Sequence, residues 1–193
     1  SSGIIIFFFN QAILKYIGEY ALVSYTIISY VNTIVVMSMA GIAQGTQPLI
    51  SYYYGKNESE KYKKLLKYGM VAAAAGSVAA VLICYVGAES IVGLFLKESE
   101  ASLSVYSVRV LRIFILSFLL AGLNVVLGGY FTSVEKAGFA TMISLTRSLI
   151  ALVISLVFLT AVFGGEAIWW APLIAESCCL VLSAGLYQWY RKK

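Results

Sequence analysis

The sequence predicts an all-α, polytopic membrane protein with six transmembrane helices and no soluble domain. Of its 193 residues, 61% are hydrophobic and 12% are charged, and its mean hydropathy is +0.88. Soluble domains carry about 25% charged residues. A helix needs roughly 20 apolar residues to cross about 30 Å of hydrocarbon, so a chain of this length with short loops holds about six spans.

Long apolar runs separated by charged or glycine-containing breaks give the positions of these spans. The runs lack the alternation of a membrane β-barrel, and a backbone in lipid must satisfy its own hydrogen bonds, so helices are expected. We expect helices at residues 3–17, 20–54, 64–86, 103–132, 138–163 and 166–190.

Basic residues in the loops predict the orientation of the bundle. If the loops alternate between two sides, nine cations fall on one side and two, Lys15 and Lys97, on the other. Cytoplasmic loops are rich in Lys and Arg. We therefore expect both ends of the chain to be cytoplasmic, together with the loops at 55–67 and 133–137. The nine cations are Lys56, Lys61, Lys63, Lys64, Lys67, Lys136, Arg191, Lys192 and Lys193.

The residues that are absent exclude several classes of function. The chain has no His and no Asp, which removes common zinc motifs, Ser/His and Cys/His pairs and aspartate dyads. We expect no enzyme, no bound metal and no cofactor. The net charge of +5 lies in short loops between apolar runs, where membrane topology explains it better than nucleic acid does.

The N-terminal end predicts a missing upstream part. The chain opens Ser-Ser-Gly and continues directly into IIIFFF, without an initiator Met or the basic region of a signal peptide. We take the chain as a fragment.

Ionisable groups inside spans are costly and each one is a functional hypothesis. Glu176 lies about ten residues into the last expected helix and is the one carboxylate deep in any expected span. Arg147 of the fifth helix could pair with it, although their expected depths differ by about one and a half turns. Two interpretations stay open: a structural ion pair, or a role in coupling to a cation.

Uncharged polar residues form a second set of candidates, which line a cavity or bond between helices. Tyr25, Ser29 and Asn32 make a stripe at helical spacing. Tyr25 and Tyr30 are candidate substrate contacts. Asn10, Gln11 and Asn124 belong to the same polar set.

One stretch, GIAQGTQPLISYYYGKNESEKYKKLLKYG at residues 41–69, carries a specific pattern. It resembles the end of the eighth helix and the following loop of multidrug and toxic compound extrusion (MATE) transporters, most closely their MepA-like branch. Residues 110–137 and 144–176 resemble the tenth to twelfth helices of that family, and include Asn124, Arg147 and Glu176. The matching positions in the first stretch are Gly41, Gln44, Gly45, Gln47, Pro48, Tyr54 and Gly55.

This resemblance implies the C-terminal lobe of a twelve-helix antiporter, helices seven to twelve, with the N-terminal lobe absent. The family implies proton- or sodium-driven export of organic cations by alternating access, in a prokaryotic plasma membrane. Some branches resemble one another in having cation-binding acids on the seventh and tenth helices. This chain has Asn10, Gln11 and Asn124 there, so Glu176 or an acid of the missing lobe is expected to serve instead.

Two other functions remain open at the sequence level. A flippase for lipid-linked precursors shares the architecture, but such proteins resemble one another in having a basic central cavity, whereas Arg147 is the one deep cation here. A fragment without transport activity is the other alternative, because half a transporter has no lobe to rock against.

Overall fold

The computed structural model describes residues 2–192, with the side chains of residues 2–5 and 98 left out of the description. Within this part of the chain every regular element is helical, which confirms the predicted all-α class. In chain order the elements are α1 Ser2–Tyr16, α2 Tyr20–Gly55, α3 Ser59–Val86, α4 Ala88–Gly93, η1 Glu98–Glu100, α5 Ala101–Phe114, η2 Ile115–Ser117, α6 Phe118–Ser133, α7 Ala137–Leu145, η3 Thr146–Ile150, α8 Ala151–Phe163, η4 Gly165–Trp170 and α9 Ala171–Lys192.

Five helical stretches among the described residues are long and apolar enough to cross a membrane. Their bounds are Tyr20–Gly55, Ser59–Val86, Ala101–Ser133, Ala137–Phe163 and Gly165–Lys192. The first expected span is present as α1, but its 15 residues extend about 22 Å, less than the hydrocarbon thickness of about 30 Å. All six expected helices are therefore present in the described part of the chain, and the first is shorter than the other five.

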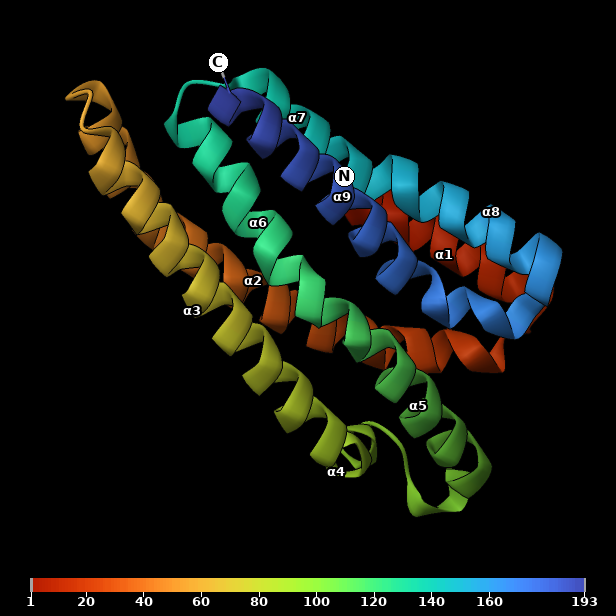
Figure 1. Cartoon of the computed structure of the whole chain (residues 1–193). Coiled ribbons are helices and arrows are strands. Elements are labelled where there is room, and N and C mark those ends of the chain that lie inside the picture. The colour runs from red at the N-terminus through yellow and green to blue at the C-terminus, as the bar shows by residue number, and fades with distance from the viewer. Residues whose placement is uncertain (1, 193) are drawn as a thin grey trace.

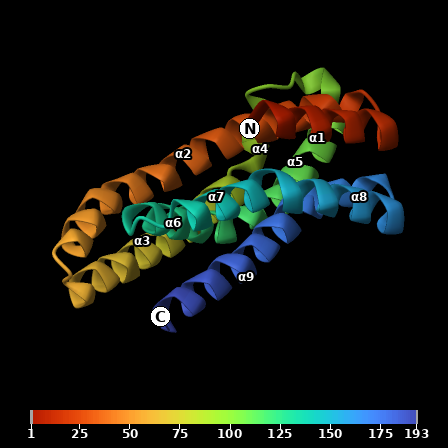
Figure 2. The same ribbon diagram turned by 90° about the horizontal axis from the view of Figure 1, so that it is seen from above.

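The helices form two groups that meet along α6 (Figures 1 and 2). One group contains α2, α3, α5 and α6, and the other contains α1, α7, α8 and α9; α6 also packs against α7 and α9. The α2–α3 and α6–α7 turns lie toward the same end of the bundle as the C-terminus, and the α1–α2, α4–α5 and α8–α9 connections lie away from it (Figure 1). The loop cations are thus gathered mainly at one end.

Glycine allows the turn between α8 and α9. Gly164 ends α8 with φ of 85°, a left-handed conformation that side chains disfavour. A Cβ on its neighbour Gly165 would lie 2.5 Å from the carbonyl oxygen of Tyr16. The Gly164–Gly165 pair therefore makes the turn and lets the end of α1 approach it.

Close packing of α3 against α6 depends on small residues. A Cβ on Gly122 would lie 2.5 Å from Ser77 Oγ and 3.3 Å from the Ala73 carbonyl oxygen. Ala73 and Ser77 are fully buried. In lipid such close approach replaces the hydrophobic effect as a source of helix association, because lipid tails are as apolar as leucine.

We expect Gly122→Ala to destabilise the bundle by about 1–3 kcal/mol, the usual cost of forcing a methyl group into a packed site. Thermal unfolding of the chain in detergent measures the effect. Gly185→Ala is the matched control, because nothing lies within 4 Å of a Cβ at that position. Equal unfolding midpoints for the two variants would contradict this account of the α3–α6 contact.

Candidate functional site

Glu176 is held between three helical segments near the middle of the bundle. Its Oε1 accepts a hydrogen bond from Arg147 Nη1 of η3 at 3.4 Å, which is also an ion pair, and its Oε2 accepts one from Asn124 Nδ2 of α6 at 2.7 Å. The side chain of Glu176 is 13% exposed and that of Arg147 is 24% exposed. The structure therefore brings together the pair that the sequence allowed, and adds Asn124 as a third member.

Asn124 is fixed by bonds on both sides of its amide. Its Nδ2 also donates to the backbone carbonyl of Glu176 at 3.0 Å, and its Oδ1 accepts from Ser183 Oγ at 3.4 Å. Because a carboxylate can only accept, the amide nitrogen must face Glu176, which sets the orientation of the side chain. Asn124 is 1% exposed, so it contacts the carboxylate and does not face open space.

Arg147 lies in a π-helical segment, Thr146–Ile150, where the sequence predicts one regular helix. A π-helical turn inserts an extra residue per turn and is common at functional sites. A short 3₁₀ segment, Ile115–Ser117, interrupts the preceding span with a tighter turn. The helix that carries Glu176, α9, contacts both irregular segments. Two of the five spans therefore depart from regular geometry next to this carboxylate.

A cavity of about 340 Å³ opens beside the pair. Tyr25, Ser29 and Asn32 of α2 line it together with Arg147 and Glu176. The polar stripe on α2 and the ion pair therefore line the same cavity. This agrees with the interpretation that the stripe lines a cavity, rather than with the alternative of hydrogen bonds between helices. Other lining residues come from α1, α5, α6, α7, α8 and α9 and from the two irregular segments; they include Phe9, Phe114, Ser117, Ala121, Leu152 and Pro172.

The cavity has an aromatic wall. The rings of Phe9 and Tyr25 stack with centroids 4.7 Å apart and planes 2° from parallel. Ser29 Oγ donates to the Tyr25 carbonyl oxygen at 2.8 Å, which leaves the lone pairs of Ser29 Oγ free to accept from another donor. A cavity with aromatic faces, hydroxyl and amide groups and one ion pair suits a small organic cation, because ring faces attract positive charge.

Three predicted candidates lie elsewhere. Gln11 lines a separate cavity of about 220 Å³ between α1 and α8, with Lys15 at its rim. Asn10, the neighbouring residue of α1, lines neither of these two cavities. Tyr30 is 58% exposed and stacks on Phe95 at 5.8 Å, away from the ion pair. The structure does not bring these side chains to Glu176.

The motif on α2 divides into a packed part and an open part. Gln47 packs against Gly129 of α6, where a Cβ would lie 2.7 Å from its Nε2. Gly41, Gln44, Gly45 and Pro48 are exposed and, at spacings of three and four, lie on one face of the helix. Gly55 ends α2. The motif therefore anchors α2 on α6 and leaves a second face without a neighbour in the described chain.

The electrostatics of the site depend on one proton or one cation. With Glu176 ionised, its charge cancels that of Arg147. With Glu176 protonated, or neutralised by a bound cation, the cavity carries a net positive charge. Within residues 2–192 no group of three or more His, Cys, Asp or Glu could hold a metal ion.

The chain is similar in sequence to bacterial multidrug export proteins. The multidrug export protein MepA of Staphylococcus haemolyticus (strain JCSC1435) is 26% identical over 166 residues, which is 86% of this chain and 36% of that protein. MepA of Staphylococcus aureus (strain bovine RF122 / ET3-1) is 24% identical over the same length. The chain therefore spans about a third of the length of these relatives.

Solved structures share the fold at low identity. An outward-facing multidrug resistance MATE transporter of the MOP superfamily matches with a TM-score of 0.89 at 17% identity, over 100% of this chain and 44% of that one. An inward-facing structure gives 0.87 at 19% identity, over 98% and 43%. A MOP superfamily transporter from Pyrococcus furiosus, whose binding pocket is described as having reversed polarity that suggests a different function, gives 0.88 at 18% identity, over 99% and 42%.

The model of the MatE family matches residues 4–157, which include the α2 motif, Asn124 and Arg147. That match covers most of the chain and agrees with the five apolar spans, with the fold of MATE transporters and with the bacterial export proteins. The chain therefore belongs to the MatE family of integral membrane transporters.

Proposed function

We propose that this chain is the C-terminal lobe of a cation-coupled antiporter that exports small organic cations by alternating access. The observation that carries the proposal is the Glu176–Arg147 pair at 3.4 Å, on the wall of a cavity with aromatic and amide groups. A multidrug export protein among the relatives supports the direction of transport and the broad class of substrate.

Charge in the cavity would couple the ion to the substrate. With Glu176 ionised and paired, the cavity is neutral and accepts an organic cation on its aromatic wall. When a proton or a sodium ion neutralises Glu176, the guanidinium of Arg147 loses its counter-charge and repels that cation. The entering ion therefore favours release of the substrate, which is the exchange that an antiporter needs. Opposing effects on one site give a coupling free energy, typically 1–3 kcal/mol.

The second lobe and the orientation belong to the same proposal. The matching transporters are more than twice as long as the segment they share with this chain. An N-terminal lobe of similar size would cover the open face of α2 and would rock against this lobe. Both ends of the chain and the basic turns would lie in the cytoplasm, since loop cations gather there, and the membrane would be a prokaryotic plasma membrane.

A lipid-linked precursor flippase is less well supported by this site. Such a function calls for a cavity of net positive charge to hold a pyrophosphate group. In the described part of the chain, the cavity contains one guanidinium, and Glu176 neutralises it.

Reconstitution of the full-length transporter tests the proposal. Proteoliposomes loaded with ethidium should export it when a proton or a sodium gradient is imposed, and much more slowly when both are dissipated. The chain without its second lobe should not transport, and serves as the control for leakage. Ethidium efflux that ignores both gradients would contradict the coupling.

A further inference from the structure

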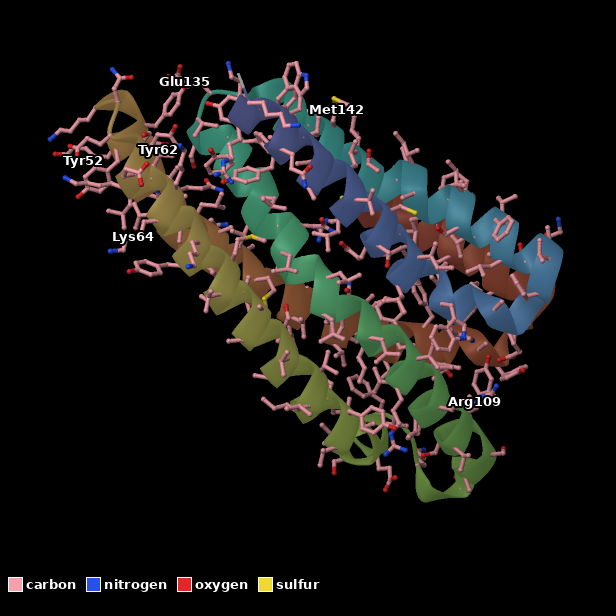
Figure 3. All side chains as sticks on the ribbon, in the orientation of Figure 1. Tyr52, Tyr62, Lys64, Arg109, Glu135 and Met142 are labelled. Carbon is pink, nitrogen blue, oxygen red and sulfur yellow. The ribbon has the colours of Figure 1, made fainter. Side chains whose placement is uncertain are left out.

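A second cavity lies at the end of the bundle that holds the basic turns, far in sequence from the α2 stripe. Its volume is about 510 Å³, within the range of about 300–1,000 Å³ typical of small-ligand sites. Segments of α3, α6, α7 and α9 line it, and it shares no lining residue with the cavity beside Glu176. Figure 1 shows the C-terminus and the α6–α7 turn at this end, and Figure 3 shows Tyr62 and Glu135 there, with Arg109 at the opposite end.

Three cations line this cavity, and no carboxylate does: Lys63 of α3, Lys136 before α7 and Arg191 of α9. None of the three forms a salt bridge with any residue that the structure describes. Glu135, next to Lys136 in the sequence, is exposed and does not line the cavity. The cavity therefore carries a concentrated positive charge without an internal counter-charge among the described residues.

The other walls are aromatic. The Tyr130 ring of α6 lies between Tyr62 and Tyr187, with centroid distances of 6.5 and 5.6 Å. Lys136 Nζ lies 5.8 Å from the Tyr190 ring centroid. Tyrosine and tryptophan concentrate at the level of lipid headgroups. The rings therefore place the three cations at the boundary between hydrocarbon and water.

From these observations we infer that this cavity binds the headgroup of an anionic phospholipid, with its phosphate among Lys63, Lys136 and Arg191. Basic pockets between transmembrane helices are known to bind such headgroups. The aromatic rings would face the glycerol and the start of the acyl chains. The inference does not depend on the proposed transport activity, because the two cavities are separate.

Native mass spectrometry of the chain in detergent, titrated with dioleoyl phosphatidylglycerol, tests the inference. We expect one phosphatidylglycerol to be retained more tightly than phosphatidylcholine with the same acyl chains. Each Lys or Arg near an anionic lipid contributes about 1 kcal/mol, or roughly fivefold in affinity. The triple variant Lys63→Gln, Lys136→Gln, Arg191→Gln should therefore bind roughly 100-fold more weakly.

The matched control removes the same charge from the same end but outside the cavity. Lys56→Gln, Lys64→Gln, Lys67→Gln changes none of the lining residues and should weaken binding by less than about fivefold, the effect of a single cation. An equal loss in both triple variants, or equal retention of the two lipids, would overturn the inference. Inorganic phosphate that displaces the lipid at equal concentration would assign the site to a free anion and would overturn it as well.

Folding of the variants is checked by their thermal unfolding. If the triple variant does not fold, the single substitutions Lys63→Gln, Lys136→Gln and Arg191→Gln replace it, each with an expected loss of about fivefold. No loss in any of the three would overturn the assignment.

Discussion

Glu176→Gln should abolish gradient-driven efflux, with an initial rate about 100-fold below that of the wild-type transporter, near the upper limit of typical coupling between two sites. Glutamine keeps the shape of the side chain and can still accept a hydrogen bond from Asn124. Its amide is neutral, however, so it cannot take up a proton or pair with a sodium ion as a carboxylate does. The measurement is ethidium efflux from proteoliposomes that contain the full-length transporter.

Glu135→Gln is the matched control for this prediction. Glu135 is an exposed carboxylate in the α6–α7 turn, outside the three cavities found. Its variant should transport like the wild type, and both variants should reach the membrane in equal amounts. Wild-type transport by Glu176→Gln would give Glu176 a packing role and remove the basis of the proposed coupling.

Arg147→Met should lower the stability of the bundle by about 2–3 kcal/mol. Removing one partner of a buried ion pair leaves an uncompensated charge, which costs about 3–5 kcal/mol when both groups are fully buried. The side chains of Arg147 and Glu176 are 24% and 13% exposed, so we expect a loss at or just below the lower end of that range. Thermal unfolding in detergent measures the loss, and the midpoint should fall by several degrees.

The double variant Arg147→Met, Glu176→Gln separates stability from function. Because it removes both charges together, it should recover most of the stability that the single arginine substitution loses. It should nevertheless fail to transport. If the destabilising effects of the two substitutions simply add, the two side chains do not interact in the folded protein, and the ion pair would be refuted.

Hydropathy was sufficient to predict the fold class, because a span must satisfy its backbone hydrogen bonds internally and this leaves only helices or closed barrels. The first expected helix, 3–17, is present as α1, Ser2–Tyr16, within one residue of the expected bounds. Interruptions within spans were not predicted. A π-helical segment at Thr146–Ile150 depends on packing against neighbouring helices, and no residue type in that segment signals it.

The site was predictable where chemistry restricted the choice. Glu176 is the one carboxylate in the apolar part of the last helix, and burial cost alone selects it. Asn124 and the α2 stripe were candidates by polarity, but the sequence could not say which of them would touch the carboxylate. Depth along each helix can be counted from the sequence, whereas the rotation of one helix against another cannot.

The unpredicted rotation of the helices also explains why three candidate residues lie away from the site. Tyr30 follows Tyr25 by five residues, a rotation of about 140°, so it lies on a different face and stacks on Phe95. Asn10 and Gln11 are polar residues on α1, but Gln11 faces the groove toward α8. Polarity identified these residues as unusual in a span, and the packing of α1 decided where they point.

The central claim is that Glu176 exchanges a cation with the substrate, and ion flux driven by substrate tests it most directly. Proteoliposomes with the full-length transporter are given an ethidium gradient, and the resulting movement of protons or sodium ions is recorded with an internal indicator. We predict that the wild type moves one of these ions against ethidium. Glu176→Gln should move neither ion and should bind ethidium more weakly, because Arg147 then has no counter-charge. Ion flux of wild-type size in Glu176→Gln would contradict the account.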